Sequence, residues 1–346
     1  MKVGVYLNTQ ARPRGVALAQ IYAELFETVR LMEELGYDAA FLPEHHQQPD
    51  GYLPSPFVMA AAILSRTERL RVHTGIHLLP LWDPMRVAED VAVLDVLSGS
   101  RITLGVGLGL VQHEFDQFGV DMRTAVSRFT EQLEILRLAW SDEPVTFHGD
   151  HFVYDAIDVH PKPLTTPKIF IGAMSDRSVE RAGRLGDGWL TDPLHSAQTI
   201  ESWAARYRAS AVEHGRQPSI WLQRDCYVSE NPADIREVWA PYLVDDWRFH
   251  FGQGLLTYGR FNAAAEPWAA KVESPDDITF EALQADRVVA GTPQEVTDQL
   301  LGLGSRIQPD GVCFRFRFPN GPAHPTVLET IRLFGSDVLP HLQPST

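Results

Sequence analysis

Three adjacent ionisable side chains, Glu44, His45 and His46, follow an apolar run and a proline in the segment FLPEHHQQPDGYLPSP (41–56). A carboxylate beside two imidazoles can hold a metal ion, move a proton, or form the polar end of a buried strand. Adjacent residues of an extended chain point to opposite sides, so at most one imidazole can face a shared site. Because a mononuclear metal site needs at least three converging ligands, a proton-transfer or structural role is favoured and no metal is expected.

A glycine-rich strand end is a second candidate. The segment LGVGLGLVQHEF contains Gly105, Gly107 and Gly109 at the end of a predicted strand. A dinucleotide-binding fingerprint needs the spacing GxGxxG and an acidic residue after the next strand, and neither is found here. Small residues at a strand end instead allow a flat, bulky group to approach the backbone.

The segment KIFIGAMSDRSVERAGRLGDGWL places Ser175 and Ser178 at the expected start of a helix that follows a strand. Ser175 or Asp176 can be an ordinary helix N-cap. Free amides and two hydroxyls at a helix N-terminus also suit a phosphate group. Taken alone, the segment favours the N-cap, and the phosphate interpretation stays open.

Two further strand ends are open to more than one interpretation. Gly75 and Ile76 end a predicted strand, where glycine permits a bulge or an unusual peptide geometry as well as an ordinary turn. In the run VCFRFRFP, Arg315 and Arg317 lie on one face of a strand and alternate with phenylalanines. Both cations can bind an anionic cofactor or substrate group, or extend outward between helices.

The composition indicates a globular protein without nucleic-acid or membrane partners. The chain has 346 residues, 44% of them hydrophobic, and a formal net charge of −15 spread along its length. Such a charge disfavours binding to nucleic acid. Cys226 and Cys313 lie far apart and form no CxxC pair, so neither a disulfide framework nor a thiolate metal site is indicated. No signal peptide or membrane-spanning stretch is recognised, and a cytoplasmic location is expected.

The positions of these candidates follow from the order of the elements. Apolar runs of strand type alternate with stretches of helical period from one end of the chain to the other. The eight strand runs are VGVYLN, DAAFL, RLRVHTGIHL, RITLGVGLG, KIFIG, DGWLT, IWLQRDCYV and DGVCFRFRF. This alternation predicts an α/β fold, a single (β/α)8 TIM barrel spanning residues 1–346. In such a barrel the functional residues lie on the loops that follow the strands.

The alternation pauses twice. Residues 144–167, after the fourth strand, have the pattern of a hairpin insertion. Residues 249–290, after the seventh strand, are rich in aromatic, glycine and alanine residues. The second insertion is expected to form part of the active site or a lid over it.

In this order, the motifs resemble the bacterial luciferase-like family of flavin-dependent monooxygenases. The resemblance is strongest from Gly36 to Phe118, through GYDAAFLPEHH, RLRVHTGIHLLPLWDP, RITLGVGLG and HEFDQFG, and it continues through IFIGAMSDRSVERAGRLGDGW. The nearest similarity is to the luciferase alpha-type chains, whose EHH triplet is intact here. The resemblance therefore implies a flavin-dependent enzyme on a TIM barrel.

The resemblance assigns roles to the strand 2 and strand 3 ends. His45 matches the family's catalytic histidine, which assists formation and breakdown of the flavin hydroperoxide. Glu44 and His46 match its neighbours and are expected to support it. Gly75 and Ile76 lie where the family has a bulge or a non-proline cis peptide behind the isoalloxazine ring.

The resemblance also implies a flavin-binding surface. Gly107 occupies the position of a reactive thiol in luciferase alpha chains, so more room is expected there. Met174, Ser175 and Ser178 match the turn that binds the flavin phosphate. Luciferases place an arginine on that phosphate directly after the thiol position, where this chain has Leu108, so another group must supply the charge or FMN binds loosely.

The expected function is that of a two-component monooxygenase. A separate NAD(P)H:flavin reductase supplies FMNH2, and the chain activates O2 as a C4a-(hydro)peroxyflavin and oxygenates a small apolar organic substrate. A dry site with one proton-handling group suits this chemistry. The alternatives are an F420-dependent oxidoreductase, which transfers hydride on the same barrel, and a non-catalytic luciferase-like partner subunit. A homodimer is implied by the resemblance alone.

Several aromatic residues are expected to line the substrate pocket, because the substrate is apolar. The expected lining residues are Phe57, Trp82, Trp189, Trp247 and Tyr258.

Overall fold

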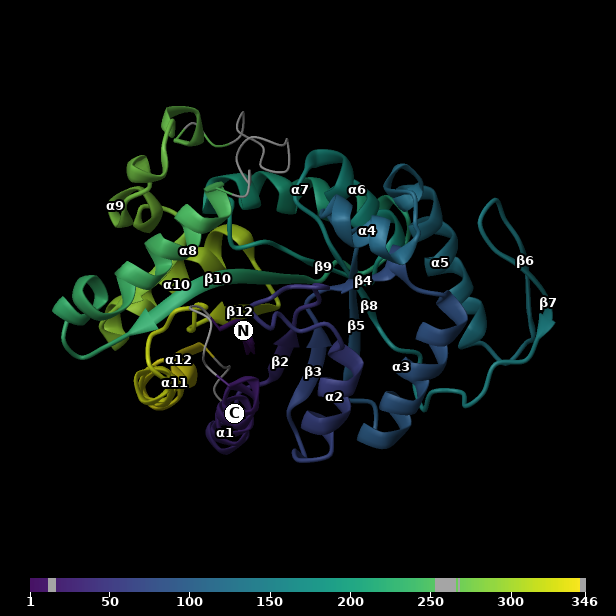
Figure 1. The fold of residues 1–346 in the computed structure, drawn as a ribbon, viewed down its shortest axis with the longest axis horizontal. Coiled ribbons are helices and arrows are strands. Elements are labelled where there is room, and N and C mark those ends of the chain that lie inside the picture. The colour runs from purple at the N-terminus through teal and green to yellow at the C-terminus, as the bar shows by residue number, and fades with distance from the viewer. Residues whose placement is uncertain (12–16, 253–265, 267, 343–346) are drawn as a thin grey trace.

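The computed structural model describes residues 1–11, 17–252, 266 and 268–342. Its centre is a closed barrel of eight parallel strands, which confirms the predicted (β/α)8 architecture (Figure 1). The barrel strands are β1 (Lys2–Tyr6), β2 (Ala39–Leu42), β3 (Arg71–Thr74), β5 (Ile102–Gly107), β8 (Ile169–Gly172), β9 (Gly188–Leu190), β10 (Ile220–Val228) and β12 (Gly311–Arg315). Pairing of β12 with β1 and of β9 with β10 closes the barrel.

Helices surround the strands and follow them in the expected order. They are α1 (Leu18–Leu35), α2 (Pro56–Leu64), α3 (Pro84–Ser98), α4 (Gln112–Phe118), α5 (Ala125–Ala139), α6 (Asp176–Leu185), α7 (Ala197–Glu213), α8 (Ala240–Gly252), α10 (Pro293–Ile307), α11 (His324–Asp337) and α12 (Leu339–Leu342). A two-residue strand, β4 (His77–Leu78), extends the third strand position and pairs with β5.

Large aromatic side chains fill the inside of the barrel. Phe41, Phe170 and Trp221 are at most 4% exposed and form one interior cluster. Glycines on neighbouring strands make room for them: a Cβ at Gly4 would lie 2.6 Å from the Phe41 ring, and one at Gly311 would lie 2.8 Å from Trp221. Phe41 and Trp221 also line the cavity at the carboxyl ends of the strands, so this cluster forms part of the cavity wall inside the barrel.

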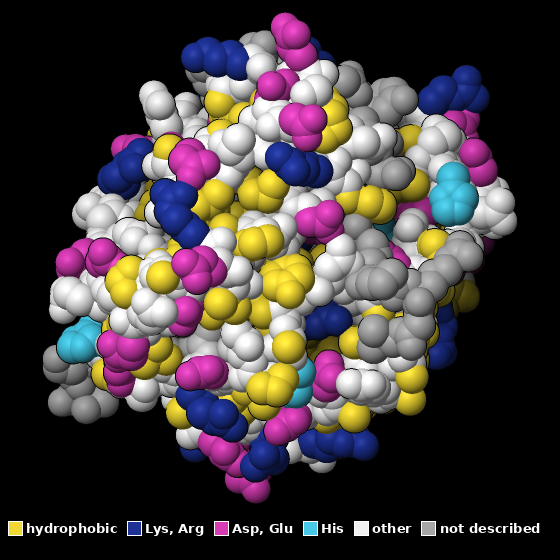
Figure 2. Space-filling model, turned by 60° about the vertical axis from the view of Figure 1, so that its left-hand side comes forward, with side chains coloured by type: hydrophobic (Ala, Val, Ile, Leu, Met, Phe, Trp, Pro, Cys, Tyr) yellow, Lys and Arg dark blue, Asp and Glu magenta, His cyan; other side chains and the backbone are white. Residues whose placement is uncertain are grey.

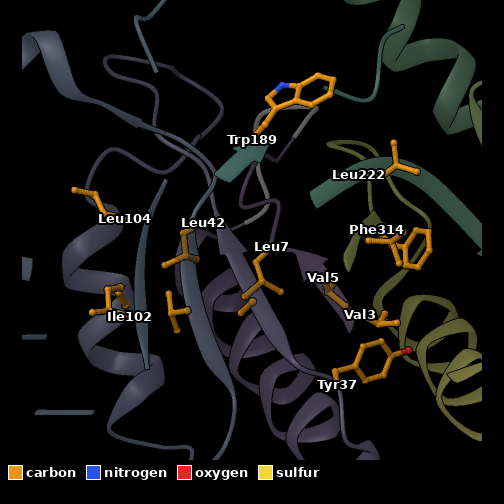
Figure 3. Packing of buried hydrophobic residues seen from close by; sticks show 14 of the residues in the cluster. Val3, Val5, Leu7, Tyr37, Leu42, Ile102, Leu104, Trp189, Leu222 and Phe314 are labelled. Carbon is orange, nitrogen blue, oxygen red and sulfur yellow. The ribbon is translucent and has the colours of Figure 1, made fainter. Parts of the chain in front are cut away.

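The larger core lies between the strands and the helices. Val3 and Val5 of β1 belong to this outer core, whereas Tyr6 belongs to the interior cluster, as the twofold period of a strand requires. Figure 3 shows Val3, Val5 and Leu7 in succession, with the ring of Tyr37 beside the start of the strand. The Tyr37 hydroxyl donates a hydrogen bond of 2.8 Å to the carbonyl of Ile331, which ties the segment before β2 to α11.

The first expected insertion is the hairpin of β6 (Val145–His148) and β7 (Val153–Ile157), which pair antiparallel. Both strands lie within residues 144–167, where the hairpin insertion was expected. The hairpin follows α5 and lies on its outer side (Figure 1). The Tyr154 hydroxyl donates a 3.2 Å hydrogen bond to Asp83 at the start of α3.

The second insertion contains more regular structure than the sequence indicated. Before residue 249, a π-helical turn (Ile235–Trp239) leads into α8. Within the insertion, the short helix α9 (Phe280–Gln284) precedes an additional strand, β11 (Val288–Gly291). This strand pairs parallel with the second half of β10, outside the barrel. This strand was not predicted, because a four-residue run between an insertion and a helix shows no clear period. Residues 253–265, including Tyr258, lie outside the described residues.

Candidate functional site

A cavity of about 490 Å³ lies at the carboxyl ends of the strands, within the usual size range of small-molecule sites. Its wall is mainly apolar, with Ile76, Leu108, Leu110 and Trp221 among the lining residues. The predicted site residues that line it are Glu44, His45, Gly75, Ile76, Met174, Ser175, Ser178 and Trp247. The barrel therefore brings together residues from β2, β3, β8 and α8.

His45 lies in the cavity wall with its side chain 32% exposed. Its Nδ1 is 3.0 Å from Oε1 of Glu114, a fully buried carboxylate on α4. The same oxygen accepts a 2.8 Å hydrogen bond from the backbone amide of His46. An ionised carboxylate accepts hydrogen bonds and cannot donate them. Glu114 therefore places the imidazole proton of His45 on Nδ1 and leaves Nε2 as the basic nitrogen.

Glu114 was not singled out in the sequence analysis, although it lies in the quoted motif HEFDQFG. The available signal was an acidic residue in the first turn of a short helix directly after a barrel strand. Exposed glutamates are also common at that position, because a helix N-terminus favours negative charge. The sequence therefore could not distinguish an exposed glutamate from a buried one that contacts His45.

Glu44 is the centre of a buried polar network. Its carboxylate accepts hydrogen bonds from His46 Nε2 at 2.8 Å, Trp82 Nε1 at 2.7 Å and the Leu78 amide at 2.9 Å, and it contacts His77 Nδ1. Burial by itself would raise the pKa of Glu44, but these partners, His77 foremost, lower it to about 2. His46 is thereby turned towards the network, which agrees with the expectation that one imidazole at most faces the cavity.

Three of the expected pocket aromatics lie behind the wall and do not line it. Phe57 and Trp82 pack against His77, with ring centroids 4.6 Å and 5.7 Å from the imidazole. Trp189 is fully buried, and its indole donates a 2.9 Å hydrogen bond to the carbonyl of Ala173. The prediction that these three line the substrate pocket was wrong, because their rings pack in or against the core between the strands and the helices.

The peptide bond between Gly75 and Ile76 is cis, one of the two geometries that the family resemblance implied. The side chain of Ile76 lies against two glycines. A Cβ at Gly107 would lie 1.9 Å from Ile76 Cδ1, and one at Gly172 would lie 3.0 Å from Ile76 Cγ2. The expectation of extra room at Gly107 was therefore wrong, because Ile76 fills that space, and Leu108 lines the cavity in place of Gly107.

Ser175 is the N-cap of α6 and forms a capping box with Ser178. The amides of Met174 and Ser175 donate to Ser178 Oγ at 3.1 Å and 2.9 Å. All three residues also line the cavity, so the turn is a helix cap that faces the candidate site. Among the lining residues that the structure describes, Arg315 is the only arginine or lysine, and it comes from β12, across the barrel from this turn.

The two arginines of the last strand have different surroundings. Arg315 points into the barrel, where it forms hydrogen bonds of 2.7 Å and 3.1 Å with Asp225 and one of 2.8 Å with Asp246. Burial opposes its charge, but the two carboxylates raise the pKa of the guanidinium above its ordinary value. Arg317 instead donates to the backbone carbonyls of Asn8 and Gln10, at 3.1 Å and 2.8 Å.

The described residues contain no group of three or more His, Cys, Asp or Glu side chains that could hold a metal ion. None of the helices in this part of the chain is long and apolar enough to cross a membrane. On the face shown in Figure 2, acidic and basic side chains are interspersed among hydrophobic ones and form no single charged patch.

Comparison with known proteins identifies the family. The profile of the luciferase-like monooxygenase family matches residues 1–306, and the chain belongs to this family. The chain is 27% identical to the alkanal monooxygenase alpha chain of Photorhabdus luminescens, covering 99% of this chain and 98% of that protein. It is 24% identical to the oxygenase component of the flavin-dependent trigonelline monooxygenase of Acinetobacter baylyi, covering 87% and 85%. The solved structure of the monooxygenase RslO1 from Streptomyces bottropensis superposes with a TM-score of 0.79 at 25% identity, covering 99% of this chain and 100% of RslO1.

One protein similar to this chain is named for a different cofactor. The chain is 29% identical to the F420-dependent hydroxymycolic acid dehydrogenase of Mycobacterium tuberculosis, covering 69% of this chain and 68% of that protein. Membership therefore makes the chain a luciferase-like oxidoreductase and leaves the choice between FMN and F420 to the site itself.

Proposed function

We propose that the protein is the oxygenase component of a two-component FMN-dependent monooxygenase. It binds FMNH2 supplied by a separate NAD(P)H:flavin reductase and inserts one oxygen atom of O2 into an apolar organic substrate. The second oxygen atom leaves as water and the flavin leaves as FMN, so atoms and electrons balance. The observation that carries the proposal is His45, which is held by a buried carboxylate at the edge of a mainly apolar cavity.

The residues at the cavity fit a flavin mononucleotide. Ser175 and Ser178, at the N-terminus of α6, offer hydroxyls to a phosphate, and this end of a helix favours an anion. Ile76 and Leu108 offer an apolar surface to a flat ring. When bound, FMNH2 supplies the two electrons that activate oxygen.

The chain itself supplies proton handling and the exclusion of water. Nε2 of His45 is the nitrogen left free to take or give a proton, since Nδ1 faces Glu114. Apolar side chains such as Leu110 and Trp247 limit the access of water to the reacting groups. His45 is therefore proposed as the catalytic residue and Glu114 as the residue that positions it.

The charge distribution favours FMN over F420. The glutamate tail of F420 carries several negative charges and needs cationic partners. Among the described residues of the cavity wall, the only arginine or lysine is Arg315, which two carboxylates already neutralise. The single phosphate of FMN needs fewer cationic partners, and the amides and hydroxyls of the α6 turn can bind it.

A non-catalytic partner subunit is a weaker alternative. His45 and its buried carboxylate are intact, and a subunit without catalytic function would have no need of a histidine oriented towards an apolar cavity. The homodimer remains a prediction from the family resemblance.

Anaerobic titration of the protein with FMNH2 and with F420H2, followed by mixing with oxygenated buffer, tests the proposal. We expect tighter binding of FMNH2 and, after oxygen, a flavin spectrum that differs from those of reduced and oxidised FMN. In the variant His45→Ala, FMNH2 should still bind while this spectrum decays faster, with release of hydrogen peroxide. The matched control is His148→Ala, since His148 lies on the β6–β7 hairpin with its side chain 62% exposed and should leave the decay unchanged. Tight binding of F420H2 without a reaction with oxygen would instead establish a hydride-transfer enzyme.

A further inference from the structure

One part of the cavity wall is polar, and the proposed oxygenation chemistry does not use it. Tyr6 of β1, Tyr52 of the loop after β2, Gln223 of β10 and Arg315 of β12 all line the cavity. We call these four residues the Arg315 wall. Arg315 and Tyr6 come from β12 and β1, which lie across the barrel from β8 and the α6 turn, whereas Gln223 comes from β10, two strand positions from β8.

The Arg315 wall is rich in hydrogen-bond donors. The hydroxyls of Tyr6 and Tyr52 are 2.6 Å apart, so one donates to the other and the second O–H remains available. Arg315 has five N–H groups and directs three of them to Asp225 and Asp246, which leaves two.

Gln223 adds a side-chain amide, for which the described residues show no hydrogen bond. Burial raises the pKa values of both tyrosines, so both hydroxyls stay protonated and able to donate at neutral pH.

The charge behind the wall disfavours an anionic ligand. Asp225 and Asp246 are 2% and 1% exposed and place two negative charges against the single positive charge of Arg315. An incoming carboxylate would therefore meet donors whose charge is already compensated, next to two buried carboxylates, of which Asp246 also lies 3.7 Å from the imidazole of His250. A neutral oxygen acceptor can use the same donors without that repulsion.

The surroundings of the wall are apolar and aromatic. Trp221 and Trp247 line the same cavity, and the rings of His45 and Tyr52 are in contact, with centroids 4.6 Å apart and their planes tilted by 33°. Flat aromatic walls favour cyclic molecules that can stack against them. The contact between His45 and Tyr52 also places the wall directly beside the proposed catalytic residue.

We infer that the Arg315 wall is the substrate-recognition subsite, and that it binds an uncharged cyclic compound through a carbonyl or another neutral oxygen acceptor. This inference rests on the proposed function in one respect, that the bound ligand is the substrate of the oxygenation. It makes Arg315, Tyr6, Tyr52 and Gln223 residues that determine specificity.

A matched series of four small molecules tests the ligand class. These are 1-tetralone, which has a neutral carbonyl, tetralin, which lacks it, tetralin-1-carboxylate, which is anionic, and 1-aminotetralin, which is cationic at pH 7. Dissociation constants are measured by calorimetry on the protein with and without bound FMN. We expect 1-tetralone to bind about 10- to 100-fold more tightly than tetralin, the range for a hydrogen bond to a charged donor. Equal binding of the two, or tightest binding of the carboxylate or the amine, would overturn the inference.

Substitutions in the Arg315 wall test whether it causes the preference for 1-tetralone over tetralin. Arg315→Lys keeps the charge between the two carboxylates but removes the spare N–H groups, so the ratio of tetralin to 1-tetralone dissociation constants should fall towards one. Arg317→Lys, two residues along the same segment and bound only to backbone carbonyls, is the control and should keep the wild-type ratio. The double variant Tyr6→Phe/Tyr52→Phe changes no charge and should lower the ratio too, which allows a decision if Arg315→Lys does not fold. A wild-type ratio in the folded variants would refute the assignment.

The ligand series separates this inference from the proposed function. Binding of tetralone and tetralin needs no oxygen, whereas the FMNH2 experiment needs neither compound. If FMNH2 reacts with oxygen as proposed and tetralin and 1-tetralone bind equally, the assignment of the subsite is wrong and the proposed function stands. If the ratio holds and FMNH2 gives no reaction, the proposed function fails and the wall recognises the substrate of another reaction.

Discussion

Replacing Glu44 by glutamine tests whether the buried network, and with it the position of His45, depends on one ionised carboxylate. Glu44 is 2% exposed and accepts from His46, Trp82 and the Leu78 amide while it contacts His77. A glutamine has one acceptor oxygen where the carboxylate has two. Its NH2 group would therefore face groups that are themselves donors.

The expected cost follows from the pKa of Glu44, which is lowered from 4.5 to about 2. Because one pKa unit corresponds to about 1.4 kcal/mol, the ionised form contributes about 3 kcal/mol to the free energy of unfolding at pH 7. Glu44→Gln should lose at least about that amount, since the misplaced NH2 group adds to the loss.

The pH dependence has a definite sign. The pKa of Glu44 is lower in the folded state, so its contribution is complete above pH 4.5 and is lost as the pH falls towards 2. The difference between the wild type and Glu44→Gln should therefore narrow from about 3 kcal/mol at pH 7 to about 2 kcal/mol at pH 3.5. Urea denaturation of both proteins at pH 7, 5 and 3.5 measures this difference in the free energy of unfolding.

The control is Glu34→Gln, because Glu34 forms only an exposed pair with Arg30 on α1. This variant should change the free energy of unfolding by less than about 0.5 kcal/mol at each pH. A loss below about 1 kcal/mol for Glu44→Gln at pH 7, or a difference that widens as the pH falls, would refute the reasoning.

Three further variants test individual contacts. Ser175→Ala should raise the FMN dissociation constant about 10-fold; a lower melting temperature with unchanged binding would show that Ser175 is an N-cap only. Gly107→Ala should lower the melting temperature because the new Cβ meets Ile76, and Ile76→Val in the same chain should recover most of the loss; no recovery would contradict this packing. Glu114→Gln should leave FMN binding intact while diverting flavin turnover from product to hydrogen peroxide, because it places an unpaired NH2 group behind His45. Product yields equal to those of the wild type would remove Glu114 from its positioning role.

The sequence predicted the barrel because each strand and helix carries its own periodic signal. The eight buried runs were recognised one by one, and their alternation with helices allowed few other architectures. The additional strand β11 (Val288–Gly291) was missed because its four residues pair only with the far half of β10. Such pairing depends on a distant segment and leaves no local pattern.

The sequence also indicated the kind of residues at the site, but not their directions. Alternation put Arg315 and Arg317 on one face, yet only the closed barrel shows that Arg315 meets Asp225 while Arg317 binds backbone carbonyls. In the same way, an aromatic residue near a strand end was expected in the pocket, whereas Trp82 lies behind it because Glu44 accepts its indole N–H.

By itself, the sequence determined the fold class, the loops on which the site had to lie, and His45 as the proton-handling candidate. The tertiary structure decided which residues surround that histidine. Glu114 is 69 positions away from His45 along the chain and reaches it only because β2 and the start of α4 meet at the same end of the barrel. Local periodicity sets secondary structure, while side-chain contacts between distant segments are set by barrel closure and packing, and these contacts decide the chemistry of the site.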